Sequence, residues 1–84
     1  MIPYKISFWK NSQSDFLKLP KEIQERIAGK LKIAQLDPFQ FFFRLKGGLC
    51  YKLRVGEYRV IADIKLDERA IEITEVGHRR NIYK

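Results

Sequence analysis

The sequence is poor in the residue types that build metal sites and disulfides. Its 84 residues include one cysteine, Cys50, and one histidine, His78. A single cysteine excludes an internal disulfide and a cysteine zinc cage, and a single histidine excludes motifs with paired histidine ligands. We therefore expect neither a bound metal nor another cofactor.

Long apolar runs are also missing. Stretches such as Phe41–Phe43 are far shorter than the roughly 20 residues that a membrane-spanning helix needs. The first residues do not have the pattern of a signal peptide. The chain has no repeats, linkers or low-complexity segments, so we expect one domain over residues 1–84 that works in the cytoplasm, away from the membrane.

Acidic residues are few relative to basic ones. Lysine and arginine total 17, aspartate and glutamate total 10, and the formal net charge is +7. Such a charge on a short chain favours nucleic acid, an anionic membrane surface or an acidic protein as a partner. A soluble domain with a basic surface explains the charge about equally well.

The hydrophobic pattern predicts an α+β domain in the order β-α-α-β-β-β, with an N-terminal helical hairpin packed on an antiparallel sheet. Residues 1–9 alternate as a strand. A short helix follows, capped by Asn11 or Ser12 with Asp15 completing a capping box. A second helix starts at Pro20 and ends before Asp37–Pro38. Its apolar stripe comprises Ile23, Ile27, Leu31 and Ala34. After a turn at Gly47–Gly48, three strands begin near residues 49, 58 and 71.

A two-residue turn at Gly56–Glu57 predicts which side chains share a face. In this register Arg54 lies opposite Arg59, with Lys52 two residues along on the same face. Like charges placed directly opposite repel each other, which favours an anion normally bound between them. Two solvated arginines that splay apart are the alternative.

The last hairpin adds further basic residues to this face. A turn at Asp67–Glu68 would place Val76 opposite Arg59, and His78, Arg79 and Arg80 would follow beside it. Tyr83 would lie near the rim. Cations interleaved with an aromatic ring are typical of sites for single-stranded nucleic acid, where they bind phosphates and stack on bases.

Such a patch can act on RNA without a metal. The 2′-hydroxyl of RNA is the nucleophile, so the protein must supply a base, cations for the developing phosphorane charge and a proton for the leaving oxygen. Lys52 can be the base if the neighbouring cations favour its neutral form. Arg59 and Arg79 can hold the phosphate bidentately. DNA has no 2′-hydroxyl and would not be cut in this way.

Three segments resemble the RelE branch of the RelE/ParE toxin superfamily: Leu45–Gly47, Tyr51–Ile61 (YKLRVGEYRVI) and Val76–Tyr83 (VGHRRNIY). The predicted element order also agrees, so the resemblance covers the whole chain. It implies a RelE-like fold, of the kind found in small microbial ribonucleases. The abundance of lysine and isoleucine favours an archaeal or thermophilic source.

The resemblance implies the toxin of a type II toxin–antitoxin pair. RelE-like toxins are endoribonucleases that cut mRNA in the ribosomal A site without a metal. A RelB-like antitoxin neutralises them, and operator DNA is bound only through the toxin–antitoxin complex. Expected partners are therefore the antitoxin, the ribosome and mRNA.

The resemblance also assigns roles to residues. Lys52 matches a catalytic lysine, Arg59 and Arg79 match phosphate-binding arginines, and Tyr83 matches a tyrosine that orients the substrate base. Arg54 stands where well-studied members have a lysine thought to be the general base. We also expect an RNA- or phosphate-binding set (Lys46, His78, Arg80) and an antitoxin-binding set (Phe41, Phe42, Phe43).

The arginine at position 54 is a departure from the family pattern. A guanidinium hardly deprotonates and is a poor general base. Either Lys52 takes that role, or the contribution of a base is lost and the rate falls.

Two other functions stay open from the sequence. One is a ParE-like toxin that inhibits DNA gyrase by binding, without hydrolysis. The other is a weakly active homologue that acts mainly in a repressor complex. The joint presence of the lysine, the arginines and the tyrosine favours the nuclease.

Overall fold

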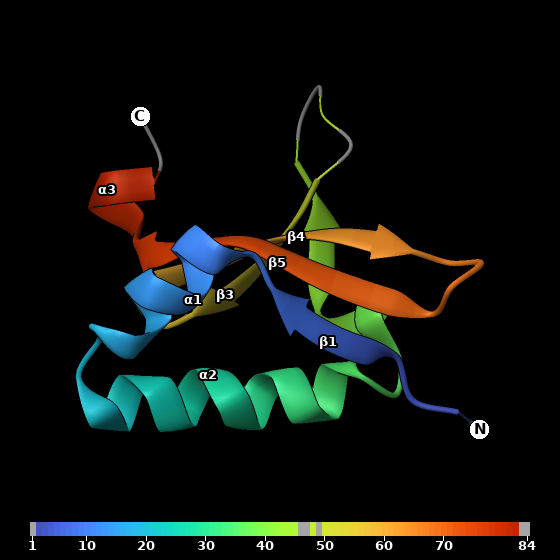
Figure 1. The fold of residues 1–84 in the computed structure, drawn as a ribbon, viewed down its shortest axis with the longest axis horizontal. Helices are drawn as coiled ribbons and strands as arrows, with labels where there is room; N and C mark the ends of the chain where they lie inside the picture. Colours follow the sequence, from blue (N-terminus) through green and yellow to red (C-terminus); the bar gives the residue numbers. More distant parts are fainter. Residues whose placement is uncertain (1, 46–47, 49, 83–84) are drawn as a thin grey trace.

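A computed structural model describes residues 2–45, 48 and 50–82, and it confirms the predicted α+β class. The elements follow the order seen in Figure 1: β1 (Lys5–Phe8), α1 (Lys10–Leu17), α2 (Lys21–Ala34), the short 3-10 helix η1 (Pro38–Gln40), β2 (Phe42–Arg44), β3 (Tyr51–Val55), β4 (Tyr58–Lys65), β5 (Ala70–His78) and α3 (Arg79–Ile82). The predicted Gly47–Gly48 turn, Lys46 and Tyr83 fall wholly or partly outside the described residues.

The described strands form one five-stranded sheet in the order β1-β5-β4-β3-β2. The sheet is mixed, which corrects the expected antiparallel one, because β1 runs parallel to β5 with Ile6 opposite Ile71. The other neighbouring pairs are antiparallel. The parallel pair joins the two ends of the chain, and an alternating pattern within each strand carries no information about such a distant partner.

Strand β2 was not expected from the sequence. It has three residues and pairs with β3, with Phe42 opposite Leu53 and Phe43 opposite Lys52. So short a strand shows too little alternation to be recognised among four phenylalanines. Its pairing turns Phe42 into the core, where it is 2% exposed, and leaves Phe43 61% exposed.

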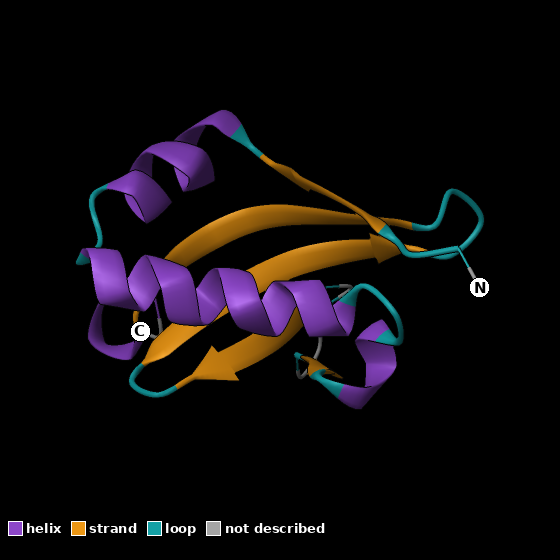
Figure 2. Cartoon of the chain, turned by 90° about the horizontal axis from the view of Figure 1, so that it is seen from below, coloured by secondary structure: helices purple, strands orange, loops and turns teal. Residues whose placement is uncertain are grey.

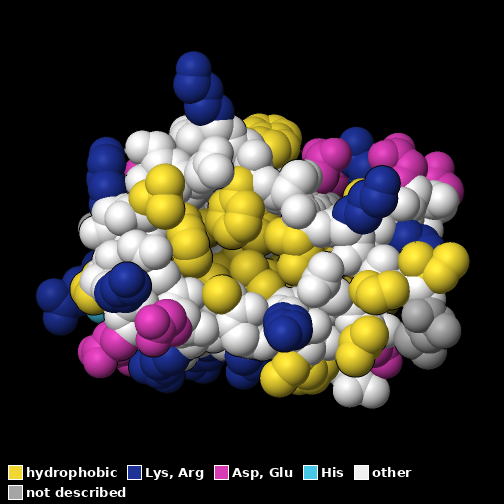
Figure 3. All heavy atoms as spheres, turned by 60° about the horizontal axis from the view of Figure 1, so that its bottom comes forward, with side chains coloured by type: hydrophobic (Ala, Val, Ile, Leu, Met, Phe, Trp, Pro, Cys, Tyr) yellow, Lys and Arg dark blue, Asp and Glu magenta, His cyan; other side chains and the backbone are white. Residues whose placement is uncertain are grey.

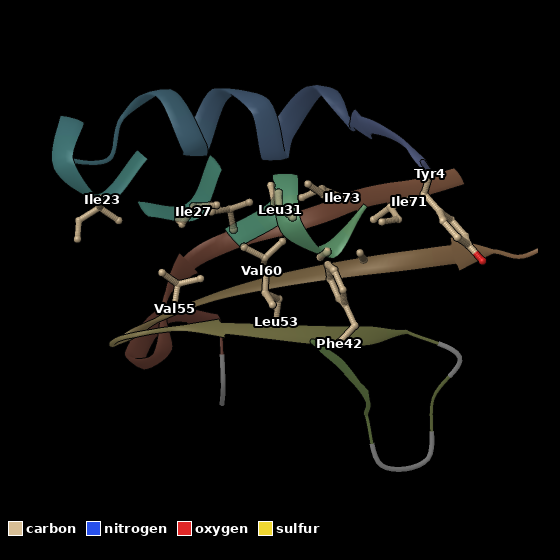
Figure 4. Packing of buried hydrophobic residues seen from close by; sticks show 13 residues of the cluster. Tyr4, Ile23, Ile27, Leu31, Phe42, Leu53, Val55, Val60, Ile71 and Ile73 are labelled. Carbon is tan, nitrogen blue, oxygen red and sulfur yellow. The ribbon is translucent and has the colours of Figure 1, made fainter. Parts of the chain in front are cut away.

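Helices α1 and α2 cover one face of the sheet, and α3 lies on the opposite side from α2 (Figures 1 and 2). The predicted stripe of α2 is confirmed, because Ile23, Ile27, Leu31 and Ala34 are buried. They meet strand residues such as Leu53, Val60 and Ile73 in the core (Figure 4). Each large aliphatic side chain buried here contributes about 1.5–3 kcal/mol. This layer holds the fold together on one face of the sheet.

Helix α1 begins at Lys10, before either of the expected caps, Asn11 and Ser12. Its N-cap is Trp9, and among the described residues no side chain caps it, so the predicted capping box at Ser12 is wrong. Ser12 is fully buried instead, and its Oγ donates a hydrogen bond of 2.7 Å to the carbonyl oxygen of Ile73 on β5. The backbone N–H of Trp9 donates to the same oxygen at 2.9 Å. These two bonds fix α1 to the sheet.

The longest helix, α2, has 14 residues. None of the helices in the described part of the chain is long and apolar enough to cross a membrane.

We predict that Ser12→Ala lowers the free energy of unfolding by about 1 kcal/mol, because a buried hydrogen bond is lost while Ile73 keeps one donor. Urea denaturation followed by circular dichroism measures the change. Ser14→Ala on the exposed side of the same helix is the matched control and should change stability by less than about 0.5 kcal/mol. Equal losses in both variants would contradict the anchoring role of Ser12.

Candidate phosphate-binding site

The β3–β4 hairpin gathers cations on the face of the sheet that α1 and α2 do not cover. Its register is the predicted one, with Arg54 opposite Arg59 and Lys52 opposite Ile61. Gly56 has a φ of 60°, which suits the first position of the predicted type II′ turn. We call this side of the sheet the open face.

The three cations differ in exposure. Arg59 is only 7% exposed, Lys52 is half-buried, and Arg54 is exposed. A partly desolvated cluster of cations interacts with an anion more strongly than the same cations in water would. Arginine also presents paired N–H groups that match two oxygens of a phosphate.

A β-bulge changes the predicted register of the last hairpin. Ile64 pairs with Ile71 and Ala62 with Ile73 as expected, but the register shifts between Ile61 and Ala62. Gly77 therefore stands opposite Arg59, in place of the expected Val76. One inserted residue moves every later side chain of the strand to the other face.

This shift moves His78 away from the cation cluster. His78 pairs with Tyr58 on the helix-covered face, and their rings meet edge to face with centroids 5.3 Å apart. Its Nδ1 accepts a hydrogen bond of 3.2 Å from the backbone N–H of Arg80. The expectation that His78 joins the open-face patch is therefore wrong. Opposite Arg59 the strand instead offers a glycine, which leaves room for the long arginine side chain.

Arg79 lies next to the turn between the two arginine-bearing strands. Its backbone N–H donates to the carbonyl oxygen of Glu57 at 2.9 Å, and its Nη1 lies 3.8 Å from Oε1 of the same residue. Both side chains of this ion pair are largely exposed, so the pair adds little stability. The backbone bond is what fixes the start of α3 beside the hairpin.

The open face is polarised along the strands. Its other end carries Asp63 opposite Glu72, and the Nζ of Lys65 lies 3.4 Å from Oε2 of Glu72. The Glu72 carboxylate raises the pKa of Lys65, and Glu68 and Asp63 raise it further. An anion is therefore attracted more strongly to the Arg54–Arg59 end than to the end that carries these carboxylates.

The structure brings together four of the expected site residues: Lys52, Arg54, Arg59 and Arg79. Arg80 is exposed on α3, where it adds positive charge. Of the expected antitoxin-binding set, Phe42 is buried in the core and is corrected to a structural residue. Sequence reasoning missed that β2 places Phe43 directly opposite Lys52.

The described residues of the open face gather cations rather than metal ligands. No group of three or more His, Cys, Asp or Glu side chains within the described part of the chain could hold a metal ion. The arrangement offers fixed positive charge at Arg54, Arg59 and Arg79, and an amine at Lys52 that can exchange a proton.

Comparison with known proteins identifies the family. Residues 6–83 match the family described as the ParE toxin of the type II toxin–antitoxin system parDE. The chain therefore belongs to this toxin family, within the RelE/ParE superfamily that the sequence motifs indicated. No curated protein matches the chain.

Solved structures of RelE toxins share the fold. A chain of the RelBE2 toxin–antitoxin complex from Mycobacterium tuberculosis is 23% identical, with a TM-score of 0.81, and the match covers 93% of this chain and all 100% of that one. A chain of the archaeal RelE–RelB complex from Pyrococcus horikoshii OT3 is 24% identical, with a TM-score of 0.77, and the match covers 95% of this chain and 99% of that one. A chain of the intact E. coli RelBE complex is 21% identical, with a TM-score of 0.79, and the match covers 89% of this chain and 95% of that one.

We predict that inorganic phosphate binds at the arginine end of the open face. In a two-dimensional NMR titration, the side-chain Nε–Hε signal of the exposed Arg54 should shift most, followed by that of Arg59, whose Nε is buried. The corresponding signal of Arg69, whose Nε donates to the carbonyl oxygen of Ile2 at the other end of the sheet, is the control. Larger shifts at the His78 ring than at both arginines would contradict this assignment.

Proposed function

We propose that this toxin is an endoribonuclease that cuts mRNA in the ribosomal A site. The observation that carries the proposal is the pairing of Arg54 with Arg59 beside Lys52 on the open face, with Arg79 fixed at the turn between them. Cations held this close together suit the oxygens of a phosphate, and arginine can contact two of them at once. The RelE toxins with the same fold point to the same class of activity.

The reaction we propose uses the substrate's own hydroxyl. The 2′-oxygen attacks the adjacent phosphorus and its proton passes to Lys52. The bond from phosphorus to the 5′-oxygen breaks as that oxygen takes a proton from a water molecule. The products are a 2′,3′-cyclic phosphate and a 5′-hydroxyl. Arg59 and Arg79 stabilise the charge that develops on the phosphorane oxygens. Arg54 adds charge, and because its guanidinium hardly deprotonates, Lys52 is the base. In this proposal Tyr83 orients the base, and Lys46 and Arg80 contact RNA.

We further propose that a RelB-like antitoxin neutralises the toxin in the cytoplasm and that operator DNA is bound only through that complex. An apolar groove between the β1–α1 side and α2 supports a protein partner (Figure 3). It is about 280 Å³ and is lined mainly by Ile6, Phe8, Phe16, Ala28 and Leu31. Apolar surface of this kind is typical of protein interaction sites. Phe43, and the half-buried Phe41, remain proposed antitoxin contacts.

We predict that wild-type protein produces discrete cuts at A-site codons in a purified translation system, detected by primer extension. Arg79→Ala should lower the cleavage rate roughly 100-fold or more, because one cation is removed from the transition state. Lys5→Ala, on the exposed outer edge of β1, is the control and should cut normally.

The same assay decides between the nuclease and a second candidate. Intact mRNA with wild-type protein, while translation stops or cells die, would contradict the nuclease. The match to the ParE family favours gyrase inhibition as the alternative, and a supercoiling assay with purified gyrase tests it. Intact mRNA together with normal supercoiling would favour a homologue that acts mainly in a repressor complex.

We predict that Lys52→Arg separates charge from proton transfer. The variant keeps a cation next to Arg54 and Arg59 but loses a group that can accept a proton. Cleavage should fall about 10²- to 10⁴-fold, the usual contribution of a general base, while RNA binding changes little. Single-turnover cleavage on programmed ribosomes measures the rate. Near-normal cleavage by Lys52→Arg would show that Lys52 acts only through its charge.

A further inference from the structure

A groove leads away from the phosphate-binding site around the edge of β3. Two adjoining hollows form it, of about 350 Å³ and about 360 Å³, and both are lined by Lys30 and Gly56. The first extends to Phe43 and Arg54, and the second extends along α2 to Arg26. We call the two together the α2–β3 groove.

The groove is open because β2 is shorter than β3. Strand β2 pairs with β3 only over Tyr51–Leu53, so Arg54 and Val55 lie beyond its end. Arg54 therefore belongs to the phosphate-binding site through its pairing with Arg59, and it also lines the groove. A strand of RNA held at the arginines can continue into the groove without leaving positively charged surface.

Gly29 keeps the α2 wall of the groove low. Glycine in the middle of a helix costs stability relative to alanine, so its presence needs a reason. A Cβ atom at Gly29 would meet nothing within 4 Å, so close packing inside the protein does not explain the glycine. The missing side chain leaves space for a ligand to approach the helix backbone.

Gly56 shapes the opposite wall. A Cβ atom there would lie 3.2 Å from Nη2 of Arg26. The glycine thus allows the guanidinium of Arg26 to lie close against the β3–β4 turn, at the side of the groove. Arg26 then faces the same space as Lys30.

The side chains of the groove suit a single strand of nucleic acid. Arg26, Lys30 and Arg54 are exposed, and none of them has an ion-pair partner among the residues that the structure describes. Glu25 also lines the second hollow, so three cations face one carboxylate. Phe43 adds an exposed ring at the end nearest Lys52. Cations spaced along a groove with an exposed ring bind phosphates and stack on bases.

We propose that the α2–β3 groove binds the single-stranded RNA that flanks the cleaved phosphate. The strand passes from the Arg54–Arg59 pair over Phe43 and around the edge of β3 to Lys30 and Arg26. This deepens the proposed nuclease function and rests on it for the position of the cleaved phosphate. The groove extends the contacts with the strand beyond the nucleotides at the cleavage site.

Binding of RNA oligonucleotides of two lengths tests the proposal. The probes are fluorescein-labelled, fully 2′-O-methylated oligonucleotides of about 4 and about 12 nucleotides, which lack the attacking hydroxyl; fluorescence anisotropy measures their affinity. Lys30→Glu should weaken binding of the longer probe about tenfold and leave the shorter one within about twofold. The slope of log affinity against log salt should fall in magnitude by about 0.7 for each lost phosphate contact.

Two controls separate the groove from general charge and from folding. Lys5→Glu makes the same charge change at the opposite edge of the sheet and should weaken binding of the longer probe by less than about twofold. Gly29→Leu fills the groove without changing the charge, and it should weaken binding of the longer probe only. Gly29→Ala should leave the binding of both probes unchanged. Thermal denaturation should show Gly29→Leu to be at least as stable as wild type, because leucine is the better helix former and the site is open.

Several results would overturn the proposal. These are equal losses in Lys30→Glu and Lys5→Glu, wild-type affinity that does not depend on probe length, or groove variants that lose antitoxin affinity and keep RNA affinity. The binding assay does not depend on cleavage. If the protein binds RNA in a length-dependent way but leaves mRNA intact, the nuclease proposal is refuted and the groove proposal stands. If the wild type cuts mRNA normally and the groove variants bind RNA as the wild type does, the groove proposal is refuted and the nuclease proposal stands.

Discussion

The register of the β3–β4 hairpin is the constraint on which the rest of the structure depends. A slip of one residue would carry Arg54 and Arg59 to the helix-covered face and Leu53 and Val60 to the open face. Arg54 is exposed, and moving its guanidinium into the apolar core would cost several kcal/mol, so the slipped register is strongly disfavoured. Gly56, with its φ of 60°, allows the tight turn that this register needs. The same turn holds Arg79 through the backbone of Glu57.

Local pattern was enough to predict the hairpin, the α2 stripe and the α+β class, because each depends on residues close together in the chain. The parallel pairing of β1 with β5 depends on the two ends of the chain meeting. The bulge in β5 coincides with a break in the alternation, because the buried apolar positions are Ile71, Ile73 and then Val76. A simple two-residue repeat misses this change of phase, which decides that Gly77, and not Val76, faces Arg59. His78 was misplaced for this reason, while Lys52, Arg54 and Arg59 were placed correctly.

One face of the sheet contributes most of the stability, and the other carries the proposed site. Stability comes from the apolar layer beneath α1 and α2, together with anchors such as the Ser12 hydrogen bond to β5. The open face is therefore able to carry cations that repel one another, since the core offsets the repulsion. An anion bound at the arginines would add favourable charge pairing on this face.

The arginine at position 54 fits a site that acts mainly through charge. Preorganised charge is usually the largest single contribution to catalysis, and a guanidinium supplies it at every pH at which the protein is folded. A lysine at this position would add a second group able to exchange protons, but it would lose the planar, two-pronged contact with phosphate. Arg54 also lies where the open face meets the α2–β3 groove. A long, permanently charged side chain at that junction can serve the phosphate being cut and the strand that leads away from it.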